Sequence, residues 1–358
     1  MKENFSSNSS DKNIAVIIPA FRVEDQISRV ISAIPAFVDE IIVVNDASPD
    51  ATRDRILSNS DPRLHLLSHI NNQGVGGAML TGYSYALSLG ADIIVKVDGD
   101  GQMDMQYLAV LIDPILQGLA DYTKGNRFLH PLALKKMPYP RKVANLGLTF
   151  MTKLASGYWN IFDPANGYTA ISAEKLRALD PDRIARNYFF ETSMLCELRK
   201  LNAVVEDISM PAIYQDETSS VKIPRELFVF SKNLFSRTIN RIFYRYFLYD
   251  FNAVSFYLIS SLILGLFGVI WGITKWAKSA HAGIPATTGT VLIAVLPIIL
   301  AVQFFVQAFA QDIDDVPHRV HPLRYFDNGS PETNLPPMQK HYIDEAAHEL
   351  VFEESIAK

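Results

Sequence analysis

The sequence predicts an α/β domain with a mainly parallel sheet, followed by a helix at the membrane interface and two transmembrane helices. Short apolar runs alternate with segments of helical spacing over about the first 220 residues. Strands that alternate with helices form a parallel sheet with helices on both faces. Two long apolar runs near the C-terminus supply the membrane helices and account for a slightly positive mean hydropathy.

Four apolar runs are expected to be buried strands, and three segments of helical spacing lie between them. The expected strands are residues 14–18, 41–44, 64–67 and 93–97, and the expected helices are residues 24–33, 49–57 and 77–89. In an open parallel sheet, ligands gather at the carboxyl ends of the strands. The residues that follow each apolar run are therefore the first candidates for a functional site.

The composition excludes several classes of protein. A net charge of -5 argues against a nucleic-acid partner, because binding to phosphate backbones requires a basic surface. The single cysteine, Cys196, rules out a disulfide framework and a cysteine-rich zinc site. The first 13 residues are polar and lack the apolar core of a signal peptide. We therefore expect the N-terminal domain to stay in the cytoplasm.

Three polar turns follow the expected strands, at residues 19–24, 45–50 and 98–102. The last turn contains Asp98-Gly99-Asp100, in which one small residue separates two carboxylates. Carboxylates suit Mg²⁺ or Mn²⁺, and these ions usually keep coordination sites for substrate phosphates. A lone Asp-Gly-Asp is more often a surface turn. Its place after a buried strand in an α/β pattern favours a metal site instead.

A glycine-rich segment, residues 71–77, precedes the third expected helix. It has neither the Gly-Lys-Ser/Thr of a Walker sequence nor the spacing of the dinucleotide fingerprint. We expect its glycines to provide turn geometry and close packing, with a backbone contact to a nucleotide as the alternative.

Two apolar runs, residues 251–274 and 282–311, are each long enough to span a bilayer, which takes roughly 20 apolar residues. Aromatic residues lie where a belt at the membrane surface is expected, namely Tyr246, Tyr249, Trp271 and Trp276. Basic residues precede the first run at positions 232, 237, 241 and 245, whereas the loop between the runs has two lysines. This bias predicts a multi-pass protein of the inner (plasma) membrane, with the α/β domain and both termini in the cytoplasm.

Arg241 and Arg245 share a helical face beside aromatic residues, which predicts an interfacial helix leading into the membrane. The whole chain then divides into five parts. We expect a disordered N-terminus (1–12), a catalytic domain (13–222), juxtamembrane helices (223–250), two transmembrane helices (251–311) and a polar C-terminal tail (312–358).

Taken together, the turns resemble those of the inverting glycosyltransferases of family 2, which have the GT-A fold. More narrowly, about residues 13–222 resemble the dolichol- or polyprenyl-phosphate hexose synthases, and the two C-terminal runs fit the membrane-anchored bacterial members. The resemblance implies a site for a nucleotide-diphosphate sugar. The implied donor-binding residues are Pro19, Phe21, Glu24, Asp46 and Asp98, and the implied ligands of the metal and diphosphate are Asp98, Asp100 and Gln102.

The same resemblance implies a site for the acceptor phosphate. Gly125-Asn126-Arg127 is similar to the Gly-Ser-Arg of the family, and Arg141 with Asn145 stands where the family grips the phosphate. Arginine suits this role because its donors pair bidentately with phosphate. Two positions depart from the family pattern. Val23 replaces the first Glu of the donor turn, and Glu217 replaces an Arg, which leaves the sugar open.

The implied reaction transfers a hexose, with inversion, from a UDP- or GDP-linked sugar to a polyprenyl phosphate such as undecaprenyl phosphate. The product would be a lipid-linked donor for modification of cell-envelope glycans. The implied catalytic residues are Asp100, Gln102, Arg127 and Arg141. An ionised phosphate oxygen needs no general base, whereas a saccharide hydroxyl would need one, with Asp163 or Glu191 as candidates.

Other functions remain open at this point. One alternative is a non-processive transferase that acts on a saccharide hydroxyl. A processive synthase would carry Gln-x-x-Arg-Trp, which is absent. A catalytically silent scaffold or part of a transporter is disfavoured by the intact pair of Asp98 and Asp100, and by apolar runs without ionisable residues. The sequence leaves open the sugar, the nucleotide, the lipid length and the oligomeric state, including a homo-oligomer.

Overall fold

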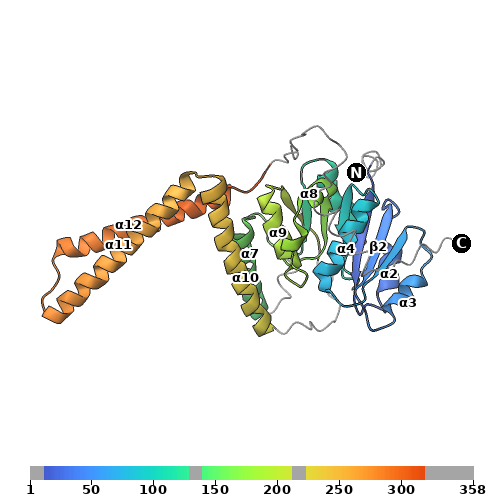
Figure 1. Cartoon of the computed structure of the whole chain (residues 1–358), viewed down its shortest axis with the longest axis horizontal. Coiled ribbons are helices and arrows are strands. Elements are labelled where there is room, and N and C mark those ends of the chain that lie inside the picture. The colour runs from blue at the N-terminus through green and yellow to red at the C-terminus, as the bar shows by residue number, and fades with distance from the viewer. Residues whose placement is uncertain (1–11, 129–138, 212–222, 319–358) are drawn as a thin grey trace. The chain divides into compact units, whose positions relative to one another are not determined.

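The computed structural model describes residues 12–128, 139–211 and 223–318, and the side chains within 12–128, 146–211 and 233–318. The chain forms two compact units. The first, the α/β unit, comprises Met1–Leu234 with Pro317–Lys358, and the second, the helical unit, comprises Phe235–Val316. Figure 1 shows the elements of both units.

The α/β unit contains a seven-stranded sheet in the order β3-β2-β1-β4-β6-β5-β7. Every neighbouring pair is parallel except those of β6, which runs antiparallel to β4 and β5. The strands are β1 (Ile14–Ala20), β2 (Glu40–Asn45), β3 (Leu64–Ser68), β4 (Ile93–Lys96), β5 (Tyr122–Asn126), β6 (Thr169–Ser172) and β7 (Val205–Ser209). The four strands expected from apolar runs are all present, and the mainly parallel α/β fold is confirmed.

Helices cover both faces of the sheet (Figure 1). One face carries α2 (Ile27–Ala33), α3 (Thr52–Leu57) and α5 (Leu108–Leu116), whose apolar side chains form one core with alternate residues of β1, β2 and β4. The other face carries α4 (Gly74–Ser88) and α9 (Phe190–Lys200). Close approach of α4 needs a glycine, since a methyl group at Gly82 would lie 2.5 Å from Ile17.

The remaining elements of the α/β unit are short, apart from α7 (Tyr139–Ser156). They are η1 (Met105–Tyr107), α8 (Ala173–Ala178) and η2 (Pro181–Arg183). Next, α10 (Ile223–Phe243) leads into a π-helical turn, η3 (Tyr244–Tyr249).

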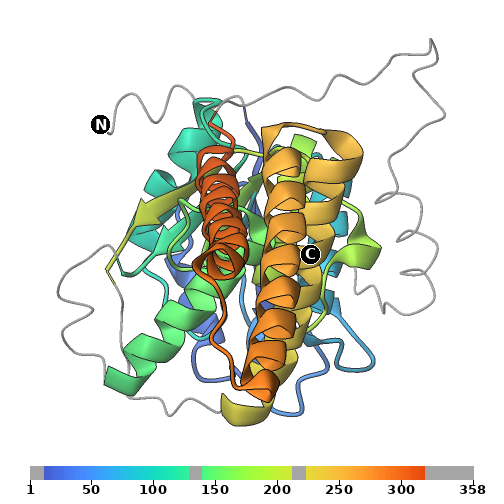
Figure 2. The ribbon, with the colours of Figure 1, turned by 90° about the vertical axis from the view of Figure 1, so that its left-hand side faces the viewer.

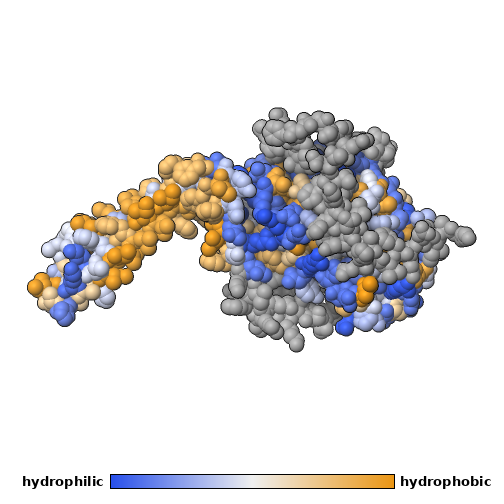
Figure 3. All heavy atoms as spheres, in the orientation of Figure 1, coloured by the Kyte–Doolittle hydropathy of each residue, from blue (hydrophilic) through white to orange (hydrophobic). Residues whose placement is uncertain are grey.

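The helical unit contains two long apolar helices, α11 (Ala253–Ala282) and α12 (Thr288–Asp314), which lie side by side as a hairpin (Figures 1 and 2). Both are long and apolar enough to cross a bilayer. Only 17% and 11% of their most apolar windows are buried, so they differ from the core helices of a soluble protein. Figure 3 shows their apolar side chains at the surface.

Small residues allow α11 and α12 to pack closely. Gly265, Gly268 and Gly272 on α11 face Ala294, Ile298 or Ala301 on α12. A hydrogen bond from Ser261 Oγ to the Ala301 carbonyl oxygen (2.8 Å) adds to this contact. In an apolar solvent, helices associate through such packing and interhelical hydrogen bonds rather than through the hydrophobic effect.

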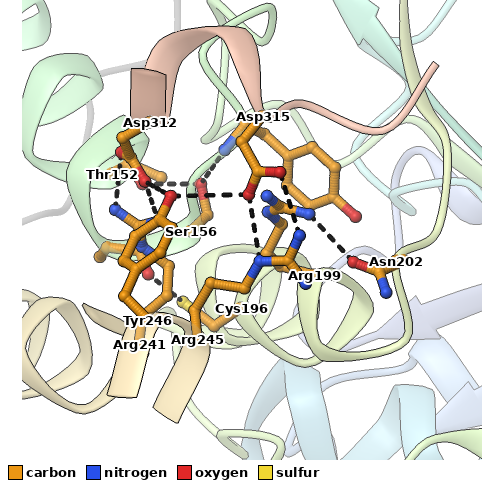
Figure 4. Close-up of polar contacts among 12 residues, drawn as sticks. Thr152, Ser156, Cys196, Arg199, Asn202, Arg241, Arg245, Tyr246, Asp312 and Asp315 are labelled. Carbon is orange, nitrogen blue, oxygen red and sulfur yellow. Dashed lines mark hydrogen bonds and ion pairs between the residues drawn. The ribbon is translucent and has the colours of Figure 1, made fainter. Parts of the chain in front are cut away.

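Two ion pairs connect the end of α10 and the π-helical turn η3 to the C-terminal end of α12 (Figure 4). Arg241 pairs bidentately with Asp312, at 2.6 and 2.9 Å, and Arg245 pairs with Asp315. Tyr246 is 1% exposed and donates its hydroxyl to Asp312 at 2.5 Å. The arginines do share a face, as expected, but this face contacts carboxylates. Tyr246 therefore does not belong to an aromatic belt, and two basic residues counted in the charge bias are neutralised.

A first prediction concerns the hairpin. Gly268→Ala should lower the free energy of unfolding of the helical unit by about 1–3 kcal/mol, because its methyl group would lie 2.6 Å from Ile298 and 2.8 Å from the Ala294 carbonyl oxygen. Gly265→Ala is the matched control, since its methyl group would meet Ala301 at an ordinary 3.5 Å. Thermal unfolding of the full chain in detergent measures both. Equal effects of the two variants would contradict the packing described.

A second prediction concerns the ion pair of Arg241 and Asp312, whose side chains are 9% and 8% exposed. Arg241→Met should destabilise the protein by about 3–5 kcal/mol, because it leaves a buried carboxylate without its cation. The double variant Arg241→Met/Asp312→Asn removes both charges and keeps an acceptor for Tyr246, so it should recover most of the loss. Chemical denaturation in detergent compares the three proteins. No recovery in the double variant would exclude an unpaired charge as the cause.

Candidate active site

The structure brings the three polar turns together at one edge of the sheet. The backbone amide of Asp46 donates to the Ala20 carbonyl oxygen at 3.0 Å, which joins the turns after β1 and β2. The turn after β4 lies against that after β1, where a methyl group at Gly99 would be 3.3 Å from the Pro19 carbonyl oxygen. Because β6 is reversed, its amino-terminal end lies at this edge as well.

The turn after β1 offers an exposed ring. Phe21 is 41% exposed, and the guanidinium of Arg22 lies 5.3 Å from its ring centroid. Arg22 adopts a φ of 56°, a conformation that is uncommon outside glycine. Glu24 accepts a hydrogen bond from the Ala51 amide at 2.8 Å and so ties this turn to the start of α3. An exposed aromatic ring at a strand end can stack on a flat ligand.

Asp46 is buried, and its carboxylate is occupied within the protein. It accepts hydrogen bonds from the amides of Gln73 and Gly74, both at 2.8 Å, and contacts His69 Nδ1 at 2.7 Å. The other ring nitrogen of His69 contacts Thr81 Oγ1 at 3.0 Å. These bonds satisfy amides at the start of α4 and explain why this helix begins at Gly74, three residues before the expected position.

The glycine-rich segment is packed against another part of the chain. The amides of Gly76 and Gly77 donate to the Arg186 carbonyl oxygen. A methyl group at Gly74 would lie 2.5 Å from the same oxygen, and Gly74 has a φ of +79°. The expected role of these glycines in turn geometry and close packing is therefore confirmed.

The acidic turn after β4 holds Asp98, Asp100 and Gln102 within five residues. Asp100 Oδ1 accepts a hydrogen bond from the Gln102 amide at 2.9 Å, and Gly101 has the positive φ (+74°) that lets the turn close. The Asp98 side chain is 33% exposed. Among the described residues no group of three His, Cys, Asp or Glu side chains is arranged to hold a metal. The hard oxygen donors fit a divalent cation whose coordination is completed by phosphate oxygens.

Lys96 lies directly beneath the acidic turn, and the sequence analysis did not include it in the site. Its ammonium group contacts Asp98 Oδ1, Glu191 Oε1 at 3.2 Å and the Gly167 carbonyl oxygen at 3.3 Å, and its side chain is 1% exposed. Burial alone would lower the pKa of Lys96, but the carboxylates of Asp98 and Glu191 hold this pKa above its usual value. The sequence feature that could have identified Lys96 is a lysine within an otherwise apolar strand.

Lys96 belongs to a row of polar residues that crosses the sheet. Paired positions place Lys96 beside Thr169, Thr169 beside Lys124, and Lys124 beside Asp207. Lys124 is fully buried, and its amine donates to the Asn166 carbonyl oxygen. Burial lowers the pKa of Lys124 to about 8, although Glu191 and Asp163 act in the opposite direction. Two buried amines thus hold consecutive carbonyl groups of one loop, residues 163–168.

Arg127 is held by the same loop. Its guanidinium pairs bidentately with Asp163, from Nε to Oδ2 at 2.8 Å and from Nη2 to Oδ1 at 3.1 Å. Asp163 is 1% exposed, whereas Arg127 is 39% exposed. Asp163 and Glu191, the two carboxylates considered as bases, are therefore both paired with cations. Arg141 and Asn145 lie in α7, but their side chains are outside the described residues, as is Glu217.

The comparisons with known proteins identify the class. The model of "Glycosyl transferase family 2" matches residues 15–180. A UDP-N-acetylglucosamine–dolichyl-phosphate N-acetylglucosaminyltransferase of Methanococcus voltae is 34% identical over 225 residues, which cover 58% of this chain and 88% of that protein. An undecaprenyl-phosphate mannosyltransferase of Micrococcus luteus is 27% identical, covering 57% and 84% of the two chains.

Solved structures agree on the fold. Glucosyl-3-phosphoglycerate synthase of Mycobacterium tuberculosis, crystallised with Mn²⁺, UDP-glucose and phosphoglyceric acid, matches with a TM-score of 0.51 and 19% identity. The match covers 67% of this chain and 83% of that one. The α/β unit therefore has the GT-A fold. This chain belongs to glycosyltransferase family 2.

A third prediction concerns pH. Burial raises the pKa of Asp207 to about 6, against hydrogen bonds from the Phe162 amide (2.8 Å) and Asn126 (2.6 Å). A raised pKa in the folded state means that the stability contributed by Asp207 is fully present below its ordinary pKa of 3.8 and is lost as pH rises through about 6. Relative to Asp207→Asn, the unaltered protein should lose about 2 kcal/mol of stability between pH 4 and 7.

Thermal midpoints of both proteins between pH 4 and 7 test this expectation. Asp113→Asn, in α5, controls for the general effect of replacing a carboxylate elsewhere in the α/β unit. A constant difference between Asp207→Asn and the unaltered protein across this range would contradict the raised pKa.

Proposed function

We propose that this chain transfers a hexose, with inversion, from a UDP- or GDP-linked sugar to a polyprenyl phosphate at the cytoplasmic surface of the plasma membrane. One observation carries the proposal. The loop of residues 163–168 contacts the acidic turn on one side, through Lys96 and Gly167, and holds Arg127 on the other, through Asp163. A candidate donor site and a candidate phosphate-binding arginine are thus parts of one rigid arrangement.

Asp98, Asp100 and Gln102 are proposed to hold Mg²⁺ or Mn²⁺ together with the donor diphosphate. The bound ion would neutralise the charge that develops on the leaving diphosphate. The oxygen donors of the acidic turn support this assignment, and the synthase of M. tuberculosis was crystallised with Mn²⁺ and UDP-glucose. Within the same turn, the hydrogen bond from the backbone amide of Gln102 to Asp100 Oδ1 orients the Asp100 carboxylate.

The turn after β1 is proposed to bind the nucleoside. The exposed ring of Phe21, near Pro19, would stack on the base, and Glu24, which anchors the turn, is proposed to accept hydrogen bonds from the ribose. The role of Asp46 is proposed to be indirect, because its carboxylate already binds the amides of Gln73 and Gly74. From its buried position, Asp46 would hold the backbone next to the donor site and would not contact the nucleoside.

A lipid phosphate suits this site better than a saccharide hydroxyl. A phosphate oxygen is ionised at neutral pH and needs no general base, whereas a hydroxyl does. Both carboxylates that would serve as a base are paired with cations, Asp163 with Arg127 and Glu191 with Lys96. The names of the relatives from M. voltae and M. luteus describe transfer to dolichyl and undecaprenyl phosphate. Arg127, with Arg141 and Asn145, is proposed to bind the acceptor phosphate.

The hairpin of α11 and α12 is proposed to anchor the enzyme in the bilayer, where its acceptor is found. Its length, hydropathy and exposed apolar side chains support this placement. The cytoplasmic orientation is proposed from the basic residues that precede the first long helix. Positions 232 and 237 carry this bias, since the arginines at 241 and 245 are paired with Asp312 and Asp315.

The fourth prediction tests the reaction. Full-length protein in detergent with Mn²⁺ or Mg²⁺, a panel of UDP- and GDP-sugars and undecaprenyl phosphate should form a glycosylated lipid phosphate, detected by mass spectrometry. Asp100→Ala should lower turnover by at least about 100-fold, because the diphosphate loses a metal ligand. Asp113→Ala, a surface carboxylate of α5, is the matched control and should retain activity.

The acceptor is tested separately with undecaprenol, dolichyl phosphate and a soluble oligosaccharide. Undecaprenol lacks the phosphate and should not react. Transfer to the oligosaccharide alone would overturn the lipid-phosphate assignment, and full activity of Asp100→Ala would overturn the metal role of that residue.

A further inference from the structure

Lys96 is the buried group of the site for which the proposed reaction has no direct use. Its ammonium group has three N–H donors, and the structure provides three acceptors: Asp98 Oδ1, Glu191 Oε1 and the Gly167 carbonyl oxygen. These acceptors belong to three separate segments, namely the acidic turn after β4, the first turn of α9 and the loop of residues 163–168. All of its donors can therefore be satisfied without water.

The carboxylate of Asp98 depends on this contact for its orientation. Among the hydrogen bonds and ion pairs of the described residues, that with Lys96 is the one that fixes an Asp98 carboxylate oxygen. The second oxygen is enclosed on the side of Gly167, since a methyl group there would overlap both Asp98 Oδ2 and the Lys96 amine. A partly exposed carboxylate (33%) is thus held between a buried cation and a glycine.

Lys124 provides an internal comparison. It is also fully buried, it lies in the same row across the sheet, and it donates to the carbonyl group of the adjacent residue of the same loop, Asn166. Its hydrogen bond goes to a backbone oxygen and not to the acidic turn. Both lysines therefore support the loop, but only Lys96 touches the carboxylate of Asp98.

We propose that Lys96 is a positioning residue, which aims the Asp98 carboxylate at the divalent cation of the donor site and fixes it relative to the loop of residues 163–168. The inference rests on the proposed metal role of Asp98 and deepens it. Mutation of a residue that hydrogen-bonds to a metal ligand commonly lowers metal affinity by about 10- to 100-fold, and we expect an effect of this size for Lys96.

A role in charge balance alone makes the opposite prediction. A cation next to a metal ligand repels the metal, so removing it would leave the affinity unchanged or raise it. Under the positioning role, removal leaves Asp98 close to Glu191 without the group that directs it, and the affinity falls. The sign of the change in metal affinity therefore separates the two roles.

The fifth prediction uses Mn²⁺ as the probe, in the presence of UDP and, in a separate series, of GDP. Binding to the full-length protein in detergent is followed by electron paramagnetic resonance, which detects free Mn²⁺. Lys96→Met should weaken Mn²⁺ binding by about tenfold or more. Lys124→Met, the matched control, should leave it within about twofold of the unaltered protein, although both variants should lower the thermal midpoint.

A second variant tests position without any change of charge. Gly167→Ala keeps Lys96, Asp98 and Glu191 but forces the Asp98 carboxylate aside, so it should also weaken Mn²⁺ binding. If Lys96→Met does not fold, Gly167→Ala provides the test of the positioning role. Unchanged or tighter binding in folded Lys96→Met, unchanged binding in Gly167→Ala, or an equal loss in Lys124→Met would overturn the positioning role.

The titration contains no acceptor, so its outcome is separate from that of the transfer reaction. The expected pattern of Mn²⁺ affinities together with no transfer to any lipid phosphate would overturn the acceptor assignment and leave the role of Lys96 intact. Failure of the unaltered protein to bind Mn²⁺ with either nucleotide would overturn the role of Lys96.

Discussion

The arrangement of the site depends on a positive charge buried inside the sheet. Moving an ammonium group out of water is costly, and the protein offsets this cost only if every donor meets an acceptor and a carboxylate stands close by. Lys96 meets both conditions by drawing together the acidic turn, the start of α9 and the loop before β6. The interior of a sheet normally excludes charged side chains. Here the charge of Lys96 fixes the relative positions of these three segments.

The same principle recurs elsewhere at this edge. Asp46 is buried with backbone amides as its partners, and Asp163 is buried with a guanidinium that reaches the surface. In each case a charged or polar group within the α/β unit holds a turn whose exposed members face the ligand side. The proposed chemistry of the edge therefore depends in part on buried residues that hold these turns in place.

The sequence was sufficient for the first four strands and for the acidic turn, because both follow from local patterns; β5, β6 and β7 were not predicted. Apolar runs have the length of buried strands, and Asp98 and Asp100 follow such a run directly. The reversal of β6 could not be predicted in this way, since strand direction depends on pairing between distant segments. For this reason the 163–168 loop precedes its strand, and a search of the residues that follow each apolar run does not reach it; Asp163 was considered only as a possible base. The hydrogen bonds between Asp46 and the start of α4 also join segments that are distant in the sequence, so a local pattern does not predict them.

The two ion pairs at the base of the hairpin join residues about 70 positions apart, Arg241 with Asp312 and Arg245 with Asp315. During synthesis the arginines emerge before the first long helix and the aspartates only after the second. In the proposed membrane arrangement, an inserted chain can form these pairs only when both helices have crossed the bilayer, because a single crossing would leave each arginine and its aspartate on opposite faces. Formation of the two pairs would therefore favour completion of the proposed membrane hairpin.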